Sequence, residues 1–391
     1  MSIISSYGAG LPDPRVAGGR LTVDLAALRA NYRILQERAG GAQVAGVVKA
    51  NAYGLGVEPV ARALWAEGCR VFFVALPAEG AALRAVLPEA YIYILAGLFE
   101  TGSADIYHEW GLLPVLNSRT EIAIWEAHGW DGDVPRPCAI HVDTGMNRLG
   151  LSAEEAVAFA SDNALTGAVT PLLVMSHLAC ADEPAHPLNG RQRESFQAVR
   201  GAFPQADSSL SNSAGTLLGP DFAFDLVRPG IALYGGNPVA GAKPMHPVAT
   251  AEARIIQLRT ARAGETVSYG APVPLACDTR IAVAAVGYGD GYHRASSGAG
   301  VPLRRTLAPG GTGFIHGRRV PVLGRVTMDL TMFDVTGLGD EITHGDWIEL
   351  FGSNVPIDEA AAAAGTIAYE MLTSLGSRYD RHYLGGEPAD G

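Results

Sequence analysis

An apolar run that ends on a lysine stands near the start of the chain: Gly46-Val47-Val48-Lys49-Ala50-Asn51-Ala52-Tyr53-Gly54. A strand that delivers a lysine to a small, polar turn is a poor way to fill a core. It is a good way to hold an amine at the mouth of an α/β domain, where burial lowers the amine's pKa for Schiff-base chemistry. Because most lysines are solvated surface groups, position alone leaves a surface role for Lys49 as the commoner alternative.

Short apolar runs recur through the first 235 or so residues, each followed by a turn and an amphipathic stretch. The runs lie at 46–49, 71–76, 92–96, 113–116, 139–142, 172–177, 209–212 and 226–228. Helical patterns lie at 24–38, 57–67, 118–128, 152–161 and 191–202, with Ser118 and Ser152 as expected N-caps. Eight alternating units predict a parallel sheet closed into a TIM-type (β/α)8 barrel, with a doubly wound open sheet as the alternative.

The pattern changes after about Pro247 to alternating β-branched segments separated by Gly, Pro and Asp turns. The predicted strands lie at 253–258, 266–268, 280–286, 320–326, 330–335 and 347–351, and short helices at 358–364 and 368–375, where Gly376 can end the second. Gly311-Thr312-Gly313 opens no helix, so we expect a hairpin loop there and not a nucleotide site. The chain is therefore predicted to be α/β + all-β: a (β/α)8 barrel over 1–247, then a C-terminal β-strand-rich domain over 248–391.

Composition restricts the class of protein. The net charge of −11 argues against nonspecific binding to nucleic acid or to an anionic membrane. The four cysteines are far apart without a CxxC pair, which favours a reducing compartment, and no metal site is expected. The N-terminus lacks a basic start and a sustained apolar segment, and the longest apolar runs are too short to cross a bilayer. We expect a cytoplasmic protein.

The chemically interesting residues of the first domain all fall at the ends of predicted strands. They are Lys49, Arg148, His177, Asn212-Ser213 and Arg228-Pro229-Gly230-Ile231. Functional side chains of a (β/α)8 barrel gather at the C-terminal ends of its strands. Each residue alone has a plainer explanation, such as a satisfied core histidine or a surface ion pair. Their coincidence predicts one site.

These residues lie in segments that resemble those of the alanine racemases, the fold-type III pyridoxal phosphate enzymes. The segment 47–54 looks like the lysine signature of that family. The resemblance continues through 143–150, 176–178, 211–215 and 228–235, and in the second domain through 267–270, 287–291, 324–329 and 368–370. It thus runs in order along essentially the whole chain.

The resemblance implies that the cofactor is pyridoxal 5'-phosphate, bound covalently to Lys49. The phosphate would be held by Tyr53, Ser213, Tyr369 and the backbone amides of Gly230 and Ile231, with Asn212 nearby. The pyridine ring would meet His177 beside it, Arg148 at its phenolic oxygen and Arg228 at its nitrogen. An arginine cannot give up its proton, so the ring nitrogen stays neutral and side reactions such as transamination are restrained. Related decarboxylases of the same barrel type place a carboxylate there.

The resemblance also implies a two-base racemisation of L-alanine and D-alanine, for peptidoglycan supply or alanine breakdown. Lys49 would be one acid/base group and Tyr269 the other. Arg148 and the Met328 backbone amide would contact the substrate carboxylate. In the family, the residues matching Tyr269 and Met328 come from the partner subunit, so we expect a homodimer. Residues that match the family's access path are Asp182, Tyr288, Arg294, Arg325 and Ile367.

The sequence departs from the family pattern at two positions of interest. Many members have a lysine, often carbamylated, where this chain has His141, so Arg148 must be supported differently. Thr327 stands where a cysteine is common. The ending 378–381 is also looser than usual and carries no inference.

Two alternatives to a strict alanine racemase remain open. One is a racemase of wider or shifted range, such as serine. The other is a noncatalytic carrier of pyridoxal phosphate. The presence of the β domain with Tyr269 and Met328 argues against this alternative.

Overall fold

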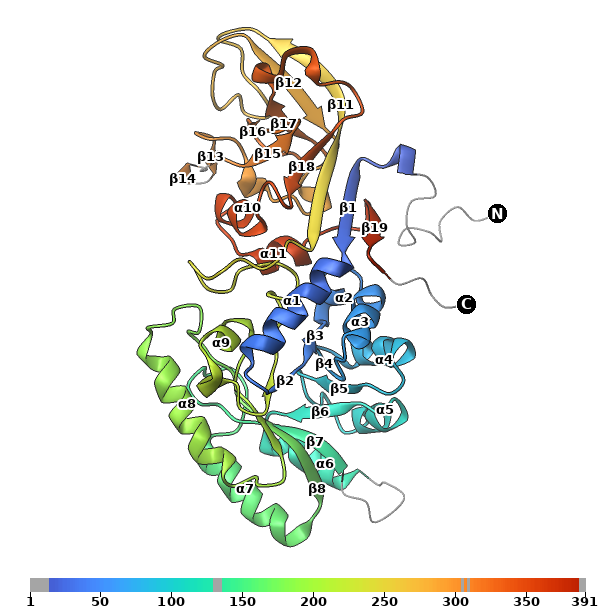
Figure 1. Ribbon diagram of the computed structural model, residues 1–391, viewed down its shortest axis with the longest axis vertical. Helices are drawn as coiled ribbons and strands as arrows, with labels where there is room; N and C mark the ends of the chain where they lie inside the picture. The colour runs from blue at the N-terminus through green and yellow to red at the C-terminus, as the bar shows by residue number, and fades with distance from the viewer. Residues whose placement is uncertain (1–13, 129–135, 304–305, 308–309, 387–391) are drawn as a thin grey trace, which may run out of the picture. The chain divides into compact units, whose positions relative to one another are not determined.

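The computed structural model describes residues 14–128, 136–303, 306–307 and 310–386. The chain divides into two compact units (Figure 1). We call Leu28–Leu233 with Asn237–Met245 the barrel unit. We call Met1–Ala27 with Tyr234–Gly236 and His246–Gly391 the sheet unit.

Seven parallel strands form the main sheet of the barrel unit, and their order in space equals their order in sequence, β3 to β9. They are β3 Gly46–Val47, β4 Val71–Val74, β5 Tyr91–Ile94, β6 Leu113–Leu116, β7 Arg136–His141, β8 Val169–Met175 and β9 Asp207–Ser209. Every neighbouring pair is parallel. Parallel neighbours require a crossover between them, so this sheet confirms the predicted βα repeat.

Two further short strands close the sheet into a ring. β10, Leu226–Val227, pairs in parallel with β2, Gln43–Val44, which leads directly into β3. On its other side β10 joins β9, because the Arg228 amide donates to the Ser211 carbonyl at 2.9 Å. The strand that begins the ring therefore lies against the strand that ends it. This closure confirms the barrel and rules out the open sheet.

Helices follow the strands and cover the ring from outside, as in a barrel of this class. They are α1 Leu25–Arg38, α3 Val57–Ala66, α4 Pro77–Val86, α5 Ser103–Glu109, α6 Arg119–Ala127, α7 Ala153–Thr166 and α8 Pro187–Arg200. Two short segments, α2 Lys49–Tyr53 and α9 Ser213–Leu217, come directly after β3 and β9, and a 3-10 turn lies at Pro220–Phe222. The two predicted N-caps are confirmed: Ser118 accepts from the Glu121 amide and Ser152 from the Glu155 amide. The sequence patterns did not predict α4 or α5.

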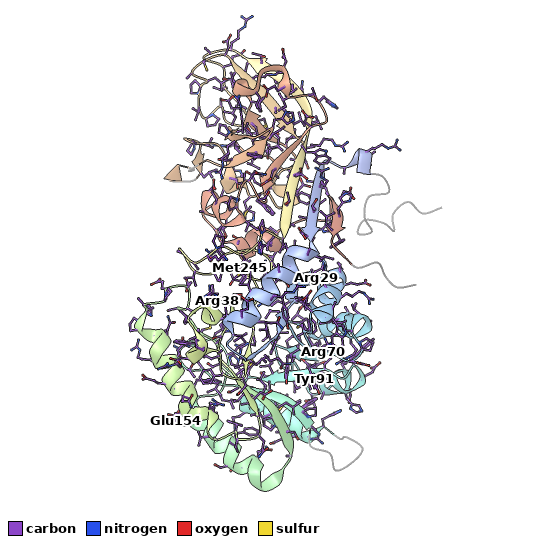
Figure 2. The ribbon with its side chains drawn as sticks, viewed as in Figure 1. Arg29, Arg38, Arg70, Tyr91, Glu154 and Met245 are labelled. Carbon is purple, nitrogen blue, oxygen red and sulfur yellow. The ribbon has the colours of Figure 1, made fainter. Side chains whose placement is uncertain are left out.

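Burial explains why these segments take their elements. All four residues of β4, Val-Phe-Phe-Val, are buried, as expected of a parallel strand covered on both faces. The helices are amphipathic: Leu28 and Leu35 on α1 and Phe159 on α7 are buried. Arg38 on α1 and Glu154 on α7 are exposed (Figure 2). The interior of the barrel and the layer between its strands and helices are thus apolar. The polar groups lie at the strand ends.

The sheet unit is built on an eight-stranded sheet in the order β12-β17-β16-β15-β18-β11-β1-β19. Its strands are β1 Gly19–Asp24, β11 Ala249–Ala261, β12 Thr279–Ala284, β15 Thr312–Ile315, β16 Arg318–Leu323, β17 Thr331–Asp334, β18 Trp347–Phe351 and β19 Tyr379–Leu384. In addition, β13 Pro302–Leu303 pairs antiparallel with β14 Thr306–Leu307. The helices are α10 Ile357–Ala363 and α11 Ala368–Thr373, and 3-10 turns lie at Pro14–Val16, Tyr288–Asp290, Arg294–Ser296 and Thr336–Glu341. β12 also pairs with β11, so six of the strands close on themselves.

Several predictions about the sheet unit need correction. The segment 266–268 is a loop and not a strand, because Ser268 has φ 72, a left-handed value that a strand does not accommodate. The hairpin loop predicted at Gly311-Thr312-Gly313 is wrong: β15 begins at Thr312, and the chain reverses at His316-Gly317, where both φ values are positive. Strand β1 was not predicted, and it pairs with β11 and β19. α11 ends at Thr373, ahead of Gly376.

The four cysteines are all described, and none is bonded to another. Within the described residues, no helix is both long and apolar enough to cross a membrane.

One arginine ties together two loops at the N-terminal ends of the barrel strands. The Arg84 guanidinium donates to the carbonyls of Pro88 and Ala90 at 2.7 and 2.8 Å, and to those of Trp110 and Gly111 at 3.0 and 2.7 Å. A lysine ammonium cannot reach both groups of carbonyls at once. This end of the barrel serves stability and not catalysis.

We therefore predict that Arg84→Lys lowers the free energy of unfolding by about 2 kcal/mol, measured by urea denaturation. Arg62→Lys is the control, because Arg62 makes an exposed pair with Glu58 and its replacement should cost under about 0.5 kcal/mol. Equal stability of the two variants would contradict this role for Arg84.

Candidate active site

The predicted site residues of the barrel unit lie together at the C-terminal ends of the strands. Lys49 follows β3, His177 follows β8, and Arg228 follows β10 directly. Arg148 lies in the loop after β7, and Asn212 is the N-cap of α9 after β9. Ring closure brings these ends to one face of the barrel. The prediction that they gather is confirmed.

The backbone after Lys49 forms a left-handed turn. Residues 50–53 have φ values of 53, 55, 53 and 57. Such values cost roughly 1–2 kcal/mol per residue for residues with a side chain. Backbone bonds hold the turn, among them Ala52 N to Val48 O at 2.9 Å and Gly54 N to Ala50 O at 2.8 Å. Strain of this kind persists where surrounding structure fixes it, and it concentrates at functional sites.

Glu79 braces this turn from the neighbouring βα unit. One carboxylate oxygen accepts from the Ala50 amide at 2.6 Å. The other accepts from the amides of Ala75 and Leu76, at 2.8 and 3.1 Å, where β4 leads into α4. Glu79 therefore fixes the residue next to Lys49 to the rigid start of a helix.

The Lys49 amine is partly buried, and its surroundings favour the neutral form. Burial lowers its pKa most, and the positive charge of Arg148 lowers the pKa further. The negative charge of Glu79 acts in the opposite direction. A lysine whose pKa is lowered in this way is available as a nucleophile and as a base.

Arg228 is a buried cation with fixed orientation. It is 4% exposed; its guanidinium donates to the Ser209 hydroxyl and, at 2.5 Å, to the Ser176 carbonyl. The guanidinium also lies 5.8 Å from the centroid of the Phe73 ring. Burial lowers the pKa of Arg228 to about 9, so it remains charged at neutral pH.

Two histidines near Arg228 are neutral. The pKa of His177 is well below its usual value because of burial and the charges of Arg228 and Arg148. His177 Nδ1 lies 3.5 Å from an Arg228 nitrogen, which can only donate, so Nδ1 is the acceptor. Burial and the same two arginines lower the pKa of His141 to about 4. His141 Nδ1 bonds Asn117 Oδ1 at 2.7 Å.

Hydroxyl groups and backbone amides converge where β9 and β10 end. Ser213 Oγ accepts from the amides of Gly230 and Ala232 at 2.8 and 3.3 Å. A Cβ added to Gly230 would lie 2.2 Å from the Tyr53 hydroxyl oxygen, so only glycine allows Tyr53 this position. Small residues, hydroxyls and backbone amides gathered in this way are typical of anion-binding sites. The residues present fit a phosphate group, and Lys49 supplies an amine at the same face.

Asp143 and Gln192 shape the loop that carries Arg148. Asp143 Oδ1 accepts from the amides of Gly145 and Met146 at 2.8 and 2.9 Å. Gln192, fully buried on α8, donates to Thr144 Oγ1 at 3.2 Å and to the His177 carbonyl at 2.9 Å. Gln192 therefore joins the Arg148 loop to the His177 loop.

The remaining predicted site residues, apart from Asp182, belong to the sheet unit. Tyr269 is 74% exposed on a loop in which Ser268, Gly270 and Ala271 have positive φ. Ser268 Oγ donates to the Arg325 carbonyl at 2.8 Å, so the Tyr269 loop rests on the Arg325 segment. This loop borders a hollow of about 1070 Å³ that Thr327 and Leu330 also line.

The other residues matched to the family's access path and substrate contact are also largely on this unit. Met328 is 55% exposed, and its carbonyl accepts from the Gly289 amide at 2.8 Å, next to Tyr288. Arg294 begins a 3-10 turn, and Ile367 and Tyr369 lie at the start of α11. Asp182 is exposed in the barrel unit, in the loop before α8. Among the described residues, no three His, Cys, Asp or Glu side chains group as a metal site would require.

Sequence patterns missed Glu79 and Gln192. Glu79 occupies the third position of α4, where a carboxylate often closes a capping box, so its bond to Leu76 N had a local signal. No local sequence signal predicts the bond of Glu79 to the Ala50 amide. Gln192 looks like an ordinary helix residue, and nothing in its neighbours marks it.

Comparisons with known proteins agree on one family. The profile described as "Alanine racemase, N-terminal domain" matches residues 23–238, and "Alanine racemase, C-terminal domain" matches residues 248–383. The chain is 54% identical over 378 residues to an alanine racemase of Rhizobium meliloti (strain 1021), covering 96% of this chain and 99% of that protein. It is also 54% identical to "Alanine racemase, biosynthetic" of Agrobacterium fabrum, covering 93% of each.

A solved structure gives the same result for the fold. The alanine racemase of Bartonella henselae, with covalently bound pyridoxal phosphate, superposes with a TM-score of 0.86 at 36% identity. The match covers 94% of this chain and 100% of that one. The family resemblance found in the sequence is confirmed.

The charges around Lys49 yield a prediction that does not need catalysis. The chain has only two lysines, Lys49 and the exposed Lys243, so Lys243 is an internal reference. In cofactor-free protein, Arg148→Met removes a repelling cation, raises the pKa of Lys49 and slows its acetylation by acetic anhydride at neutral pH. Glu79→Gln removes an attracting anion, lowers that pKa and speeds acetylation.

Mass spectrometry of the two lysine peptides gives the Lys49 to Lys243 ratio for each variant. Shifts in opposite directions support the two charge effects. A shift in the same direction for both variants would contradict them.

Proposed function

The chain belongs to the alanine racemase family, and from this premise we propose that it interconverts L-alanine and D-alanine by a two-base mechanism with pyridoxal 5'-phosphate on Lys49. The observation that carries the proposal is the placing of Lys49. Its amine has a lowered pKa, stands on a strained turn and shares one barrel face with an anion cradle and the buried Arg228. Nothing in a structural role requires that combination.

The residues that would hold the cofactor are those of the barrel face, together with Tyr369 of the sheet unit. Lys49 Nζ would carry it covalently, and Ser213, Tyr53, Tyr369 and the amides of Gly230 and Ile231 would bind its phosphate, near Asn212. When bound, pyridoxal phosphate withdraws electrons from the substrate and makes its Cα–H bond acidic. Arg148 and His177 would fix the ring's orientation.

Arg228 would set the electronic character of the site. It remains charged and can only donate, so it would bond the pyridine nitrogen without protonating it. Its anchoring by Ser209 and Ser176 keeps the guanidinium in one orientation. A neutral ring nitrogen suits a racemase, because it limits competing reactions such as transamination.

Racemisation removes a proton from one face of Cα and returns one to the other. Lys49 Nζ would exchange the proton on one face, and its lowered pKa suits that task. Tyr269 Oη of the partner subunit would exchange the proton on the opposite face. The large exposure of Tyr269 in the single chain is what a residue donated to a partner requires. The proposed enzyme is a homodimer with shared sites.

Arg148 and the Met328 backbone amide of the partner subunit would bind the substrate carboxylate. The residues that line the proposed access path are Asp182, Tyr288, Arg294, Arg325 and Ile367. We place the enzyme in the cytoplasm, which the acidic charge and unbridged cysteines support. In sequence, the barrel domain is proposed to span residues 1–247 and the β domain 248–391, although strand β1 of the first segment pairs with β11 and β19 of the second.

Covalent attachment to Lys49 is tested by reduction of the cofactor-loaded protein with sodium borohydride, which makes the linkage permanent. Peptide mapping should find the added mass on the Lys49 peptide and none on the Lys243 peptide. Label on Lys243, or on neither lysine, would contradict the assignment.

The reaction is tested by incubating the cofactor-loaded protein with L-alanine in D₂O. We expect D-alanine with deuterium at Cα, resolved by chiral chromatography and mass spectrometry. Turnover of L-serine without turnover of L-alanine would show a racemase of shifted range instead. Absence of turnover of both would favour the carrier alternative.

A further inference from the structure

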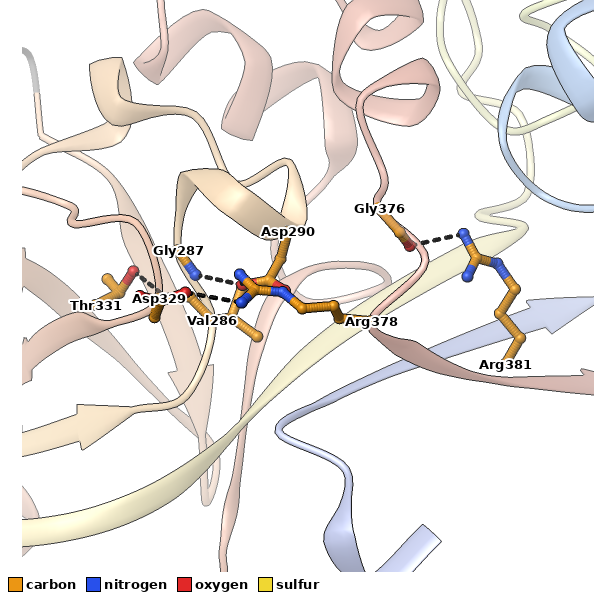
Figure 3. Close-up of polar contacts among 8 residues, drawn as sticks. All are labelled: Val286, Gly287, Asp290, Asp329, Thr331, Gly376, Arg378 and Arg381. Carbon is orange, nitrogen blue, oxygen red and sulfur yellow. Dashed lines mark hydrogen bonds and ion pairs between the residues drawn. The ribbon is translucent and has the colours of Figure 1, made fainter. Parts of the chain in front are cut away.

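Arg378, in the segment that follows α11, makes three bonds that link distant parts of the sheet unit (Figure 3). Its Nε and Nη2 bond the two oxygens of Asp290 at 2.6 and 2.9 Å. Its Nη1 bonds Asp329 at 2.7 Å. Arg378 thus bridges a buried carboxylate, whose side chain is 6% exposed, and a surface carboxylate next to Met328.

Asp290 is fixed on its own side of this bridge. Its Oδ2 accepts from the Gly287 amide at 2.9 Å (Figure 3). Its carbonyl accepts from the Gly376 amide at 3.0 Å. It therefore offers Arg378 a rigid anchor. Bidentate pairs of this kind fix geometry as well as charge.

The loop that carries Met328 is held against the same anchor. The Tyr288 amide donates to the Thr327 carbonyl at 2.9 Å, and the Gly289 amide to the Met328 carbonyl at 2.8 Å. A Cβ added to Gly287 would lie 2.2 Å from the Thr327 oxygen and 2.5 Å from the Met328 oxygen, so the loop approaches as closely as glycine allows.

The Met328 amide itself is left without a protein acceptor among the described residues, although its carbonyl is bonded. An exposed donor held in place by its neighbours suits an anionic ligand group. The negative charge of Asp329, one residue on, would repel such a group. Arg378, whose single positive charge is shared with Asp290, offsets part of the Asp329 charge and tethers its side chain.

We propose that Arg378 is a positioning residue: by bridging Asp290 and Asp329 it holds the Met328 backbone amide in place for the substrate carboxylate and offsets the adjacent charge. The inference rests on the proposed function, because it assigns a support to one of its substrate contacts. Arg378 takes no part in proton transfer, so its replacement should affect substrate binding more than turnover.

The test compares Arg378→Gln with wild type as cofactor-loaded enzyme. We expect KM for alanine to rise about tenfold with kcat within about twofold, since binding is lost and the proton-transfer groups are untouched. Arg378→Lys keeps the positive charge but loses the guanidinium's bonds to both carboxylates, so it should give an intermediate KM. Gly287→Ala should raise KM similarly, because it displaces the same loop without altering any charge.

Arg381→Gln is the matched control. Arg381 lies three residues on, and its guanidinium donates to the Gly376 carbonyl at 3.0 Å (Figure 3). It should leave KM unchanged even where it lowers the melting temperature. An Arg378→Gln variant that loses stability yet keeps the wild-type KM would show a structural role only and overturn the proposal, as would a fall in kcat at constant KM.

Propionate, which has the carboxylate of alanine without its amine, separates this inference from the proposed function. Saturation-transfer NMR measures its binding without turnover. Weaker propionate binding by Arg378→Gln than by wild type supports the inference even if alanine is not racemised, and equal binding contradicts it. Failure of wild type to racemise alanine counts against the proposed function alone.

Discussion

Backbone hydrogen bonds join the last strand of the barrel to the first. They bring the site residues close together in space, although these residues lie far apart along the chain. The Ala45 amide donates to the Val227 carbonyl at 2.9 Å, and the Val47 amide to the Pro229 carbonyl at 3.2 Å. The strand that leads to Lys49 therefore runs beside the strand that leads to Arg228. An open sheet would leave these two strands at opposite edges. The proposed chemistry depends on this closure.

Closure also concentrates positive charge in a partly buried space. Arg228 is fully enclosed and stays cationic, and its charge, with that of Arg148, keeps His141 and His177 neutral. The same conditions lower the pKa of Lys49, and among the described residues the nearby negative charge of Glu79 opposes them. A phosphate bound nearby would be attracted by the same cations that disfavour protonation of the Lys49 amine. One arrangement thus serves anion binding and an amine base together.

Residue types and spacing predicted the barrel, its eight strands and the residues at their ends. Those features depend on local apolar runs, which the sequence displays directly. Glu79, Gln192 and Arg378 escaped because they act on backbone atoms or on carboxylates far along the chain. A side chain that bonds backbone atoms gives no sequence pattern, because any residue type can supply its partner. Arg378 contacts Asp290 and Asp329 only once the sheet has formed. Strand β1 escaped similarly, since its partners, β11 and β19, lie more than two hundred residues away.

Each active site is proposed to combine Lys49 of one chain with Tyr269 of another. A subunit-exchange experiment mixes two inactive variants, Lys49→Ala and Tyr269→Phe, under conditions where dimers re-form. In a mixed dimer one site has both residues intact, so a 1:1 mixture should regain about a quarter of wild-type racemase activity. A mixture no more active than the separate variants would contradict the shared site, because both residues would then belong to the same chain.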